Sequence, residues 1–138
     1  MGTTVGDVLS PDVVSISSAR TVREAAELMR VADIGAVVVA RAGRLVGLVT
    51  DRDLVVRVLA AGGGPDTPVA AACSPDLVTV CPDDDVADAA RVMARHAVRR
   101  LPVVAGDRVV GIVSLGDLAA VRDPSSVLGQ VSSARPNG

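Results

Sequence analysis

The stretch Gly47-Leu48-Val49-Thr50-Asp51-Arg52-Asp53 ends an aliphatic run with a hydroxyl residue and places a carboxylate three positions later. The same pattern recurs 64 positions along the chain as Gly111-Ile112-Val113-Ser114-Leu115-Gly116-Asp117. β-Branched residues favour a strand, and Thr or Ser followed three residues later by an acidic side chain is typical of a helix start. Each stretch therefore predicts a strand that leads directly into a helix.

The rest of the chain repeats around these two stretches. Residues 11–54 align with residues 75–118 without a gap and are identical at fourteen of 44 positions. Such self-similarity indicates one structural unit present twice. In each copy, short apolar runs and Gly-containing turns predict a strand, a helix, a strand, a hairpin turn, a further strand and a second helix. The predicted strands are 13–16, 36–40 and 45–49 in the first copy, and 77–80, 101–104 and 109–113 in the second.

The first helix of each copy is predicted from its start signal and its apolar stripe. Thr21 with Glu24 forms a capping-box pattern, and Asp85 with Asp88 is a weaker acidic analogue. Apolar residues then recur at i, i+3, i+4 and i+7, which places them on one helix face. We expect this face to pack inward; its residues are Val22, Ala25, Ala26 and Met29, and Val86, Ala89, Ala90 and Met93.

The repeat also predicts the division of the chain into domains. The second helix of the first copy is expected to run from 51 to 61, where Gly62-Gly63-Gly64-Pro65 ends it. We therefore expect a first repeat with its N-terminal segment at 1–61, a linker at 62–68, a second repeat at 69–123 and a flexible tail at 124–138. A single copy of about 60 residues is marginally stable, so the two copies are expected to pack around a pseudo-twofold axis.

Composition excludes several classes of function. The 138 residues carry a formal net charge of −2, which argues against a nucleic acid or an anionic membrane as partner. All 14 basic residues are Arg and no Phe, Tyr or Trp is present, so lysine chemistry and base-stacking platforms are excluded. No secretory signal or run of about 20 apolar residues occurs, and a cytoplasmic location is expected. Cys73 and Cys81 are expected to be reduced thiols.

The duplicated junction has two interpretations. In the first, Thr50 and Ser114 simply cap a helix, and the acidic residues favour the positive end of the helix dipole. In the second, the free N–H groups of the helix start also bind a phosphate, and the carboxylate accepts the hydroxyls of a ribose. Capping alone explains the pattern, so both interpretations stay open at this stage.

The two copies resemble a tandem pair of cystathionine-β-synthase (CBS) domains, the Bateman module. The resemblance is carried by Gly47-x-x-Thr50-x-x-Asp53, by Gly111-x-x-Ser114-x-x-Asp117 and by the block 98–104, Val-Arg-Arg-Leu-Pro-Val-Val. It covers about residues 5–120. Asp33-Ile34-Gly35-Ala36, residues 47–54 and the ending Leu59-Ala60-Ala61-Gly62 are further similar to small stand-alone actinobacterial CBS proteins of the hypoxic-response type. The implied fold is α/β, with two β-α-β-β-α repeats forming one CBS pair.

The resemblance implies a regulatory module that binds AMP, ADP, ATP or S-adenosylmethionine in the cleft between repeats. It implies a homodimer that signals to a separate, unidentified target protein and requires no cofactor. The implied contacts to ribose are Asp53 and Asp117, and those to phosphate are Thr50, Ser114, Arg99 and Arg100. The implied adenine pockets are Val14, Ile34, Ala36 and Val49 in one site, and Val78, Val98, Pro102 and Val113 in the other. The alternative is a ligand-free CBS dimer that acts through protein interactions.

Other reactive residues do not form a recognisable catalytic or metal site. His96 is the only histidine, and no nucleophile motif accompanies it, so no enzymatic activity is expected. The spacings of Cys73, Cys81 and His96 match no zinc-binding pair, so no metal is expected. Asp83-Asp84-Asp85 is interpreted as favouring a helix start, and the Arg91, Arg95 and Arg99 series as a solvated helix face.

Overall fold

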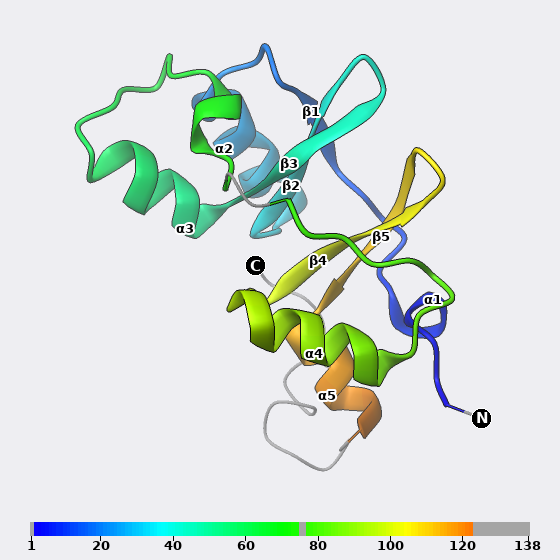
Figure 1. Cartoon of the computed structure of the whole chain (residues 1–138). Coiled ribbons are helices and arrows are strands. Elements are labelled where there is room, and N and C mark those ends of the chain that lie inside the picture. The colour runs from blue at the N-terminus through cyan, green and yellow to red at the C-terminus, as the bar shows by residue number, and fades with distance from the viewer. Residues whose placement is uncertain (1, 75–76, 123–138) are drawn as a thin grey trace. The chain divides into compact units, whose positions relative to one another are not determined.

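A computed structural model of the chain describes residues 2–74 and 77–122 (Figure 1). Their contacts divide them into two compact units. The first-repeat unit contains residues 14–74 and 77, and the second-repeat unit contains residues 2–13 and 78–122. The predicted flexible tail at 124–138 lies outside the described residues. No helix in the described ranges is both long and apolar enough to cross a membrane.

The first-repeat unit contains a mixed sheet of three strands (Figure 1). The order is β1-β2-β3, in which β1 pairs with β2 in parallel and β2 pairs with β3 in antiparallel fashion. The predicted second helix starts as one α-helical turn, α3, and continues as a π-helix, η1. The elements are β1 (Ser15–Ser17), α2 (Val22–Ala32), β2 (Ala36–Arg41), β3 (Arg44–Thr50), α3 (Asp51–Asp53), η1 (Leu54–Leu59) and the 3-10 helix η2 (Val69–Ala72).

The second-repeat unit contains an antiparallel hairpin of two strands with three helices. Its elements are α1 (Val5–Val8), α4 (Val86–His96), β4 (Arg100–Ala105), β5 (Arg108–Ser114) and α5 (Leu115–Arg122). Here the prediction of a strand at 77–80 is wrong. Within the described residues, a single parallel bridge between Val80 and Val103 takes the place of that strand.

Backbone N–H groups hold β1 in the sheet of the first repeat. Val38 donates to the carbonyl of Val14 at 2.9 Å, and Ser18 donates to the carbonyl of Ala40 at 2.8 Å. These two bonds flank the register in which Ile16 pairs with Val39. The first repeat therefore has hydrogen bonds on both sides of the central pair, and three residues qualify as a strand.

Prolines remove the corresponding donors in the second repeat. Pro102 stands where the first repeat has Val38, and Pro82 stands where it has Ser18. Proline has no backbone N–H, so neither flanking bond can form. What remains is the central pair: Val80 donates to the carbonyl of Pro102 at 3.1 Å, and Val104 donates to that of Val80 at 2.8 Å. The missing strand is thus a consequence of two side-chain substitutions.

The predicted apolar stripes of the two helices pack into the cores of the two units, except at position i+4. In α2 and α4 the residues at i, i+3 and i+7 are buried, but Ala26 is exposed and Ala90 only half-buried. Position i+4 of each stripe therefore lies at the edge of the buried face. The buried core residues from these helices are Val22, Ala25, Met29, Val86, Ala89 and Met93.

The capping hydrogen bonds at the N-termini of α2 and α4 also differ. Thr21 accepts a hydrogen bond from the N–H of Glu24 at 3.3 Å, and Glu24 in turn accepts from the N–H of Thr21, which confirms the capping box. The corresponding residue of α4, Asp85, makes no capping hydrogen bond with its side chain. The acidic analogue predicted for Asp85 with Asp88 is therefore absent.

The segments that precede each repeat are exchanged between the units. The first-repeat unit contains η2, in which Val69 is fully buried and donates to the carbonyl of Arg20 at 2.8 Å. The second-repeat unit contains α1, in which Val5 is fully buried and donates to the carbonyl of Asp84 at 2.8 Å. The two bonds occupy equivalent positions of the repeat. Contacts in space therefore group the N-terminal segment with the second repeat, whereas sequence order groups it with the first.

Candidate functional site

The strand-to-helix junction of the first repeat is closed by two reciprocal hydrogen bonds. Thr50 ends β3, and its hydroxyl oxygen accepts from the N–H of Asp53 at 3.1 Å. The N–H of Thr50 donates to Oδ2 of Asp53 at 2.8 Å. This arrangement satisfies two backbone donors that a helix start otherwise leaves free.

The junction of the second repeat has the same geometry. The hydroxyl of Ser114 accepts from the N–H of Asp117 at 3.1 Å, and the N–H of Ser114 donates to Oδ2 of Asp117 at 2.9 Å. The capping interpretation of the duplicated motif is therefore confirmed in both copies. It occupies only Oδ2 of each carboxylate and leaves Oδ1 for other partners.

Each junction is fixed beside the loop that follows the first helix of its repeat. In the first repeat Asp51 donates to the carbonyl of Gly35 at 3.0 Å, and Ala36 pairs with Thr50 across the β2–β3 ladder. In the second repeat Leu115 donates to the carbonyl of Arg99 at 2.7 Å. The backbone thus brings the predicted residues around 34–36 to Thr50.

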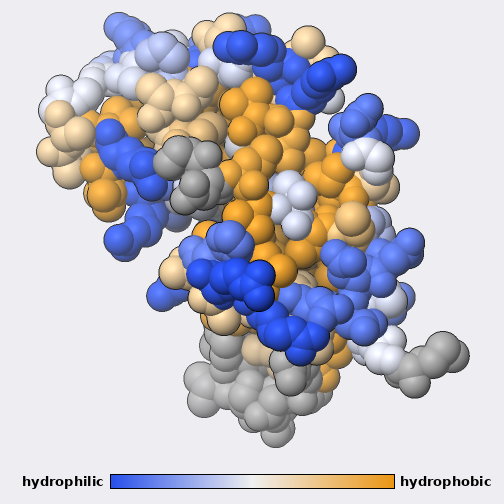
Figure 2. Space-filling model, viewed as in Figure 1, coloured by the Kyte–Doolittle hydropathy of each residue, from blue (hydrophilic) through white to orange (hydrophobic). Residues whose placement is uncertain are grey.

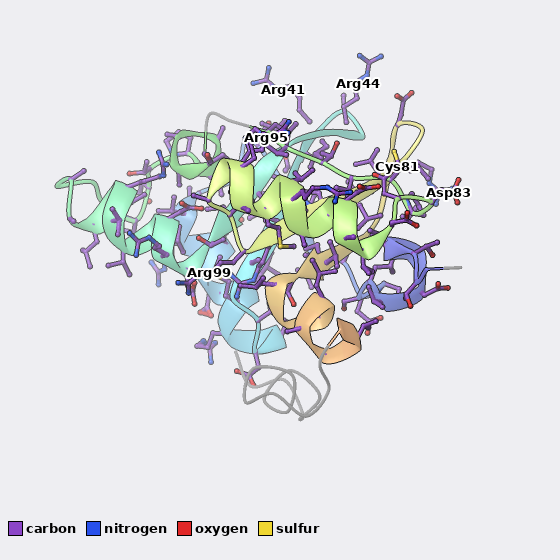
Figure 3. The ribbon with its side chains drawn as sticks, turned by 60° about the horizontal axis from the view of Figure 1, so that its bottom comes forward. Arg41, Arg44, Cys81, Asp83, Arg95 and Arg99 are labelled. Atoms are coloured by element: carbon purple, nitrogen blue, oxygen red, sulfur yellow. The ribbon has the colours of Figure 1, made fainter. Side chains whose placement is uncertain are left out.

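In the second repeat, the same backbone positions hold positively charged side chains. Arg100 pairs with Ser114 across the β4–β5 ladder, and Arg99 follows the end of α4 (Figure 3). Neither guanidinium forms a salt bridge within the described part of the chain. Gly35 and Ala36 occupy these positions in the first repeat. Two cations therefore lie beside the Ser114 junction, whereas the Thr50 junction has none at those positions.

The two carboxylates also differ in their remaining oxygen. Oδ1 of Asp53 accepts from Nε of Arg57 at 3.2 Å, one helical turn later. The residue equivalent to Arg57 in the second repeat is Val121, which offers no donor. Across the described ranges, Oδ1 of Asp117 takes part in no hydrogen bond with the protein. This difference was not predicted from the sequence, although the i, i+4 spacing of Asp53 and Arg57 indicates an ion pair on a helix.

The glycines of the two motifs make room for the chain itself. A Cβ atom on Gly111 would lie 2.6 Å from the carbonyl oxygen of Ser10 and 2.7 Å from Cδ1 of Leu9. A Cβ atom on Gly47 would lie 3.1 Å from Cβ of Cys73. Leu9 and Cys73 are equivalent positions of the two exchanged segments. Each motif glycine therefore leaves room for the segment that precedes the other repeat, Cys73 at Gly47 and Leu9 with Ser10 at Gly111.

Of the two cysteines, Cys73 lies against Gly47 of the first-repeat motif. Burial, and then the negative charge of Asp53, raise the pKa of the Cys73 thiol above its ordinary value. A thiol is a poor nucleophile when its thiolate is disfavoured. Cys81 is exposed, and His96 is exposed at the end of α4. Within residues 2–74 and 77–122, no three His, Cys, Asp or Glu side chains gather in an arrangement that could hold a metal ion.

The residues expected to contact adenine differ in accessibility. Val14, Ile34, Val78 and Val98 are half-buried and present part of their surface. Ala36 and Pro102 are buried on the strands beside them. Val49 and Val113 are fully buried in the two cores. An accessible apolar surface at either junction therefore comes from the half-buried residues.

Comparison with known proteins identifies the class of this chain. The CBS domain family matches residues 5–60 and 65–123, and the chain belongs to that family. It is therefore a tandem CBS pair. It is similar to the CBS domain-containing protein YhcV of Bacillus subtilis, with 43% identity over 115 residues, 83% of this chain and 82% of that protein. It is also similar to hypoxic response protein 1 of Mycobacterium tuberculosis, with 38% identity over 119 residues, 85% of this chain and 83% of that protein.

Solved structures show the same fold. A hypoxic response protein I with two coordinated zinc ions has a TM-score of 0.77 and 35% identity, covering 85% of this chain and 97% of that one. The CBS domain pair of protein MJ0100, in complex with 5'-methylthioadenosine and S-adenosyl-L-methionine, has a TM-score of 0.81 and 26% identity. The match covers 91% of this chain and all of that chain. The predicted α/β fold with two CBS repeats, and the resemblance to hypoxic-response proteins, are confirmed.

Proposed function

We propose that this CBS pair is a non-catalytic regulatory module that binds an adenosyl ligand. One observation carries the proposal: among the described residues, Oδ1 of Asp117 accepts no hydrogen bond at its helix start, and Arg99 and Arg100 beside the same junction form no salt bridge. A carboxylate that accepts hydrogen bonds from hydroxyl groups suits ribose, and guanidinium groups suit phosphate. The complex of the related MJ0100 pair with two adenosyl compounds supports this ligand class.

The same observation ranks the two junctions. At the second repeat, no described residue donates to Oδ1 of Asp117, and two arginines supply positive charge. At the first repeat, Oδ1 of Asp53 is already bound by Arg57. A ribose at Asp53 has to displace that ion pair. We therefore propose that a phosphorylated ligand such as AMP, ADP or ATP binds through Asp117, Ser114, Arg99 and Arg100 more tightly than any ligand binds through Thr50 and Asp53.

The alternative function is a ligand-free interaction module. It is favoured by the exposed apolar side chains of η1, where Val55, Val56 and Leu59 are 55%, 49% and 71% exposed. On the face in Figure 2, hydrophobic side chains lie among hydrophilic ones over the helical segment that follows β3. Such a surface is typical of contact with another protein. In this alternative the target protein, not a nucleotide, is the partner.

A thermal-shift experiment separates these functions. AMP, ADP, ATP, S-adenosylmethionine and NAD are added to pure protein that carries no copurified ligand, beside the Asp53→Ala and Asp117→Ala variants. A ligand at about 100 times its dissociation constant adds about 2.7 kcal/mol of stability. We expect a rise in melting temperature with a phosphorylated adenosine that is lost in Asp117→Ala. No rise with any of the five compounds at millimolar concentration contradicts the proposal and supports the interaction module.

A further inference from the structure

The N-terminal segment at residues 3–10, which we call the N-terminal strap, is hydrogen-bonded to the second-repeat unit. Val5 donates to the carbonyl of Asp84 at 2.8 Å, and its side chain is fully buried. Gly6 donates to the carbonyl of Pro82 at 2.8 Å. In sequence the whole first repeat separates the strap from the rest of this unit. Contacts of this kind therefore hold the strap in place.

The end of the strap pairs with the outer edge of β5. Ile112 of β5 lies opposite Pro102, which has no N–H, so the backbone groups of Ile112 point away from β4. Ser10 binds both of them: its N–H donates to the carbonyl of Ile112 at 2.8 Å, and the N–H of Ile112 donates to the carbonyl of Ser10 at 3.0 Å. The strap thus closes this edge of the hairpin.

The same edge of β5 carries the cap of the proposed nucleotide site. Residues two apart in a strand direct their backbone groups the same way, roughly 7 Å from each other. Ser114 is two residues after Ile112, and its N–H donates to Oδ2 of Asp117 at 2.9 Å. Ser10 and Asp117 therefore bind successive outward N–H groups of one strand.

The strap and the site are also joined through the core of the unit. Leu118 follows Asp117 in α5, is 2% exposed, and belongs to the same core cluster as Val5. Helices α1 and α5 are in contact. Leu9 lies against Gly111 of β5, where an added Cβ would be 2.7 Å from its Cδ1. A displacement of the strap therefore disturbs both elements that hold Asp117.

The equivalent segment η2 binds the first repeat through fewer hydrogen bonds. Gly6 and Ser10 of the strap correspond to Ala70 and Ser74, which make no equivalent bond with any described residue. The additional bonds thus occur in the repeat whose junction carries Arg99 and Arg100, the proposed primary site.

We propose that docking of the N-terminal strap and binding of a nucleotide at Asp117 stabilise each other, so that the strap reports occupancy of the site. This coupling rests on the proposed function. A ligand that fixes Ser114 and Asp117 orders the end of β5 and the start of α5, against which the strap packs. A docked strap holds the same two elements in the binding geometry, and the two effects are equal because coupling between binding free energies is reciprocal.

Amide hydrogen exchange of the full chain measures this coupling without any substitution. We expect saturating AMP to slow exchange at Val5, Gly6 and Ser10 at least about fivefold, because their N–H groups bind the second repeat. Val69 of η2 is the internal control, since its N–H makes the equivalent bond in the first repeat. Its exchange should change by less than about twofold.

Leu9→Ala tests the coupling from the side of the strap. It shortens the side chain that lies against Gly111 and changes no residue of the proposed site. We expect the dissociation constant of AMP, measured by calorimetric titration, to rise about fivefold. Cys73→Ala is the matched control, because Cys73 lies against Gly47 in the same way. It should leave that constant within about twofold of the wild-type value.

The outcomes separate this proposal from the proposed function. A chain that binds AMP without slower exchange in the strap, or with equal slowing at Val5 and Val69, overturns the coupling and leaves the nucleotide site standing. A chain that does not respond to AMP overturns both. Circular dichroism shows whether Leu9→Ala is folded, and hydrogen exchange of the wild-type chain decides alone where that variant is not.

Discussion

The two repeats share one sequence pattern but differ in how many strands that pattern forms. In the first repeat, Val38 and Ser18 supply the N–H groups that hold β1 against β2. In the second, Pro102 and Pro82 stand at the same positions, and only Val80 remains bridged. In both repeats the apolar pattern determines which residues face the core, whereas the available backbone N–H donors determine whether a β-ladder forms.

The strand-to-helix junctions of the two repeats differ in the charged groups around their carboxylates. Both repeats keep the reciprocal cap between a hydroxyl and a carboxylate. The first repeat pairs its carboxylate, Asp53, with Arg57, whereas Asp117 forms no salt bridge with any described residue and lies at the junction beside Arg99 and Arg100. A common framework thus holds two sites of different electrostatics. We expect the difference to appear in ligand affinity more than in stability.

The largest expected loss of stability follows substitution of the glycines in the two repeated motifs, and it differs between them. Gly111→Ala places a methyl group 2.6 Å from a backbone oxygen of Ser10, whereas Gly47→Ala meets the side chain of Cys73 at 3.1 Å. Overpacking against backbone is hard to relieve, so we expect a loss of about 3 kcal/mol for Gly111→Ala and about 1 kcal/mol for Gly47→Ala. Urea unfolding measures both. Equal losses would show that the two exchanged segments pack with the same tolerance.

A proline exchange tests the account of the missing strand. Val38→Pro copies the second repeat into the first and leaves the carbonyl of Val14 without its donor. We expect a loss of about 2 kcal/mol, together with faster hydrogen exchange at Ile16 and Ser18. The reverse variant, Pro102→Val, is the control and should change stability by less than about 1 kcal/mol. Unchanged exchange in Val38→Pro would mean that these donors do not hold β1.

The smallest effect on stability is expected from the ion pair of the first junction. The side chain of Arg57 is 44% exposed and that of Asp53 is 16% exposed, so Arg57→Ala should cost no more than about 0.5 kcal/mol. It frees Oδ1 of Asp53, and we expect AMP to bind the first repeat severalfold more tightly. Val121→Arg makes the opposite change beside Asp117 and should weaken AMP there. Calorimetric titration of both variants checks this, and identical affinities would remove the role assigned to Oδ1.

Much of the fold follows from the sequence because it depends on local patterns. The hairpins, α2 with its cap at Thr21, and the capped junctions at Thr50 and Ser114 were all predictable. The strand at 77–80 was predicted wrongly, because apolar spacing carries no information about the donors missing at Pro82 and Pro102. Sequence position also cannot show that α1 and η2 pack on the opposite repeats, since that choice depends on contacts distant along the chain.

The framework of the candidate site and the arginines of its second junction were predicted from the sequence, whereas the ion pair at Asp53 was not. Repetition alone pointed to Asp53 and Asp117, because equivalent residues occupy equivalent places. The difference between them depends on neighbours one turn or one strand away, namely Arg57 and Arg100. Full burial of Val113 was likewise not evident from its aliphatic character, since core and pocket residues have the same composition.

Calorimetric titration with AMP measures whether the second repeat holds the primary nucleotide site. We expect one dominant binding event in the wild-type protein. Its affinity should fall at least tenfold in Asp117→Ala and stay within about threefold in Asp53→Ala, where tenfold corresponds to about 1.4 kcal/mol. Both variants must first be shown to be folded by their thermal unfolding. Loss of binding in Asp53→Ala with retention in Asp117→Ala would contradict the claim.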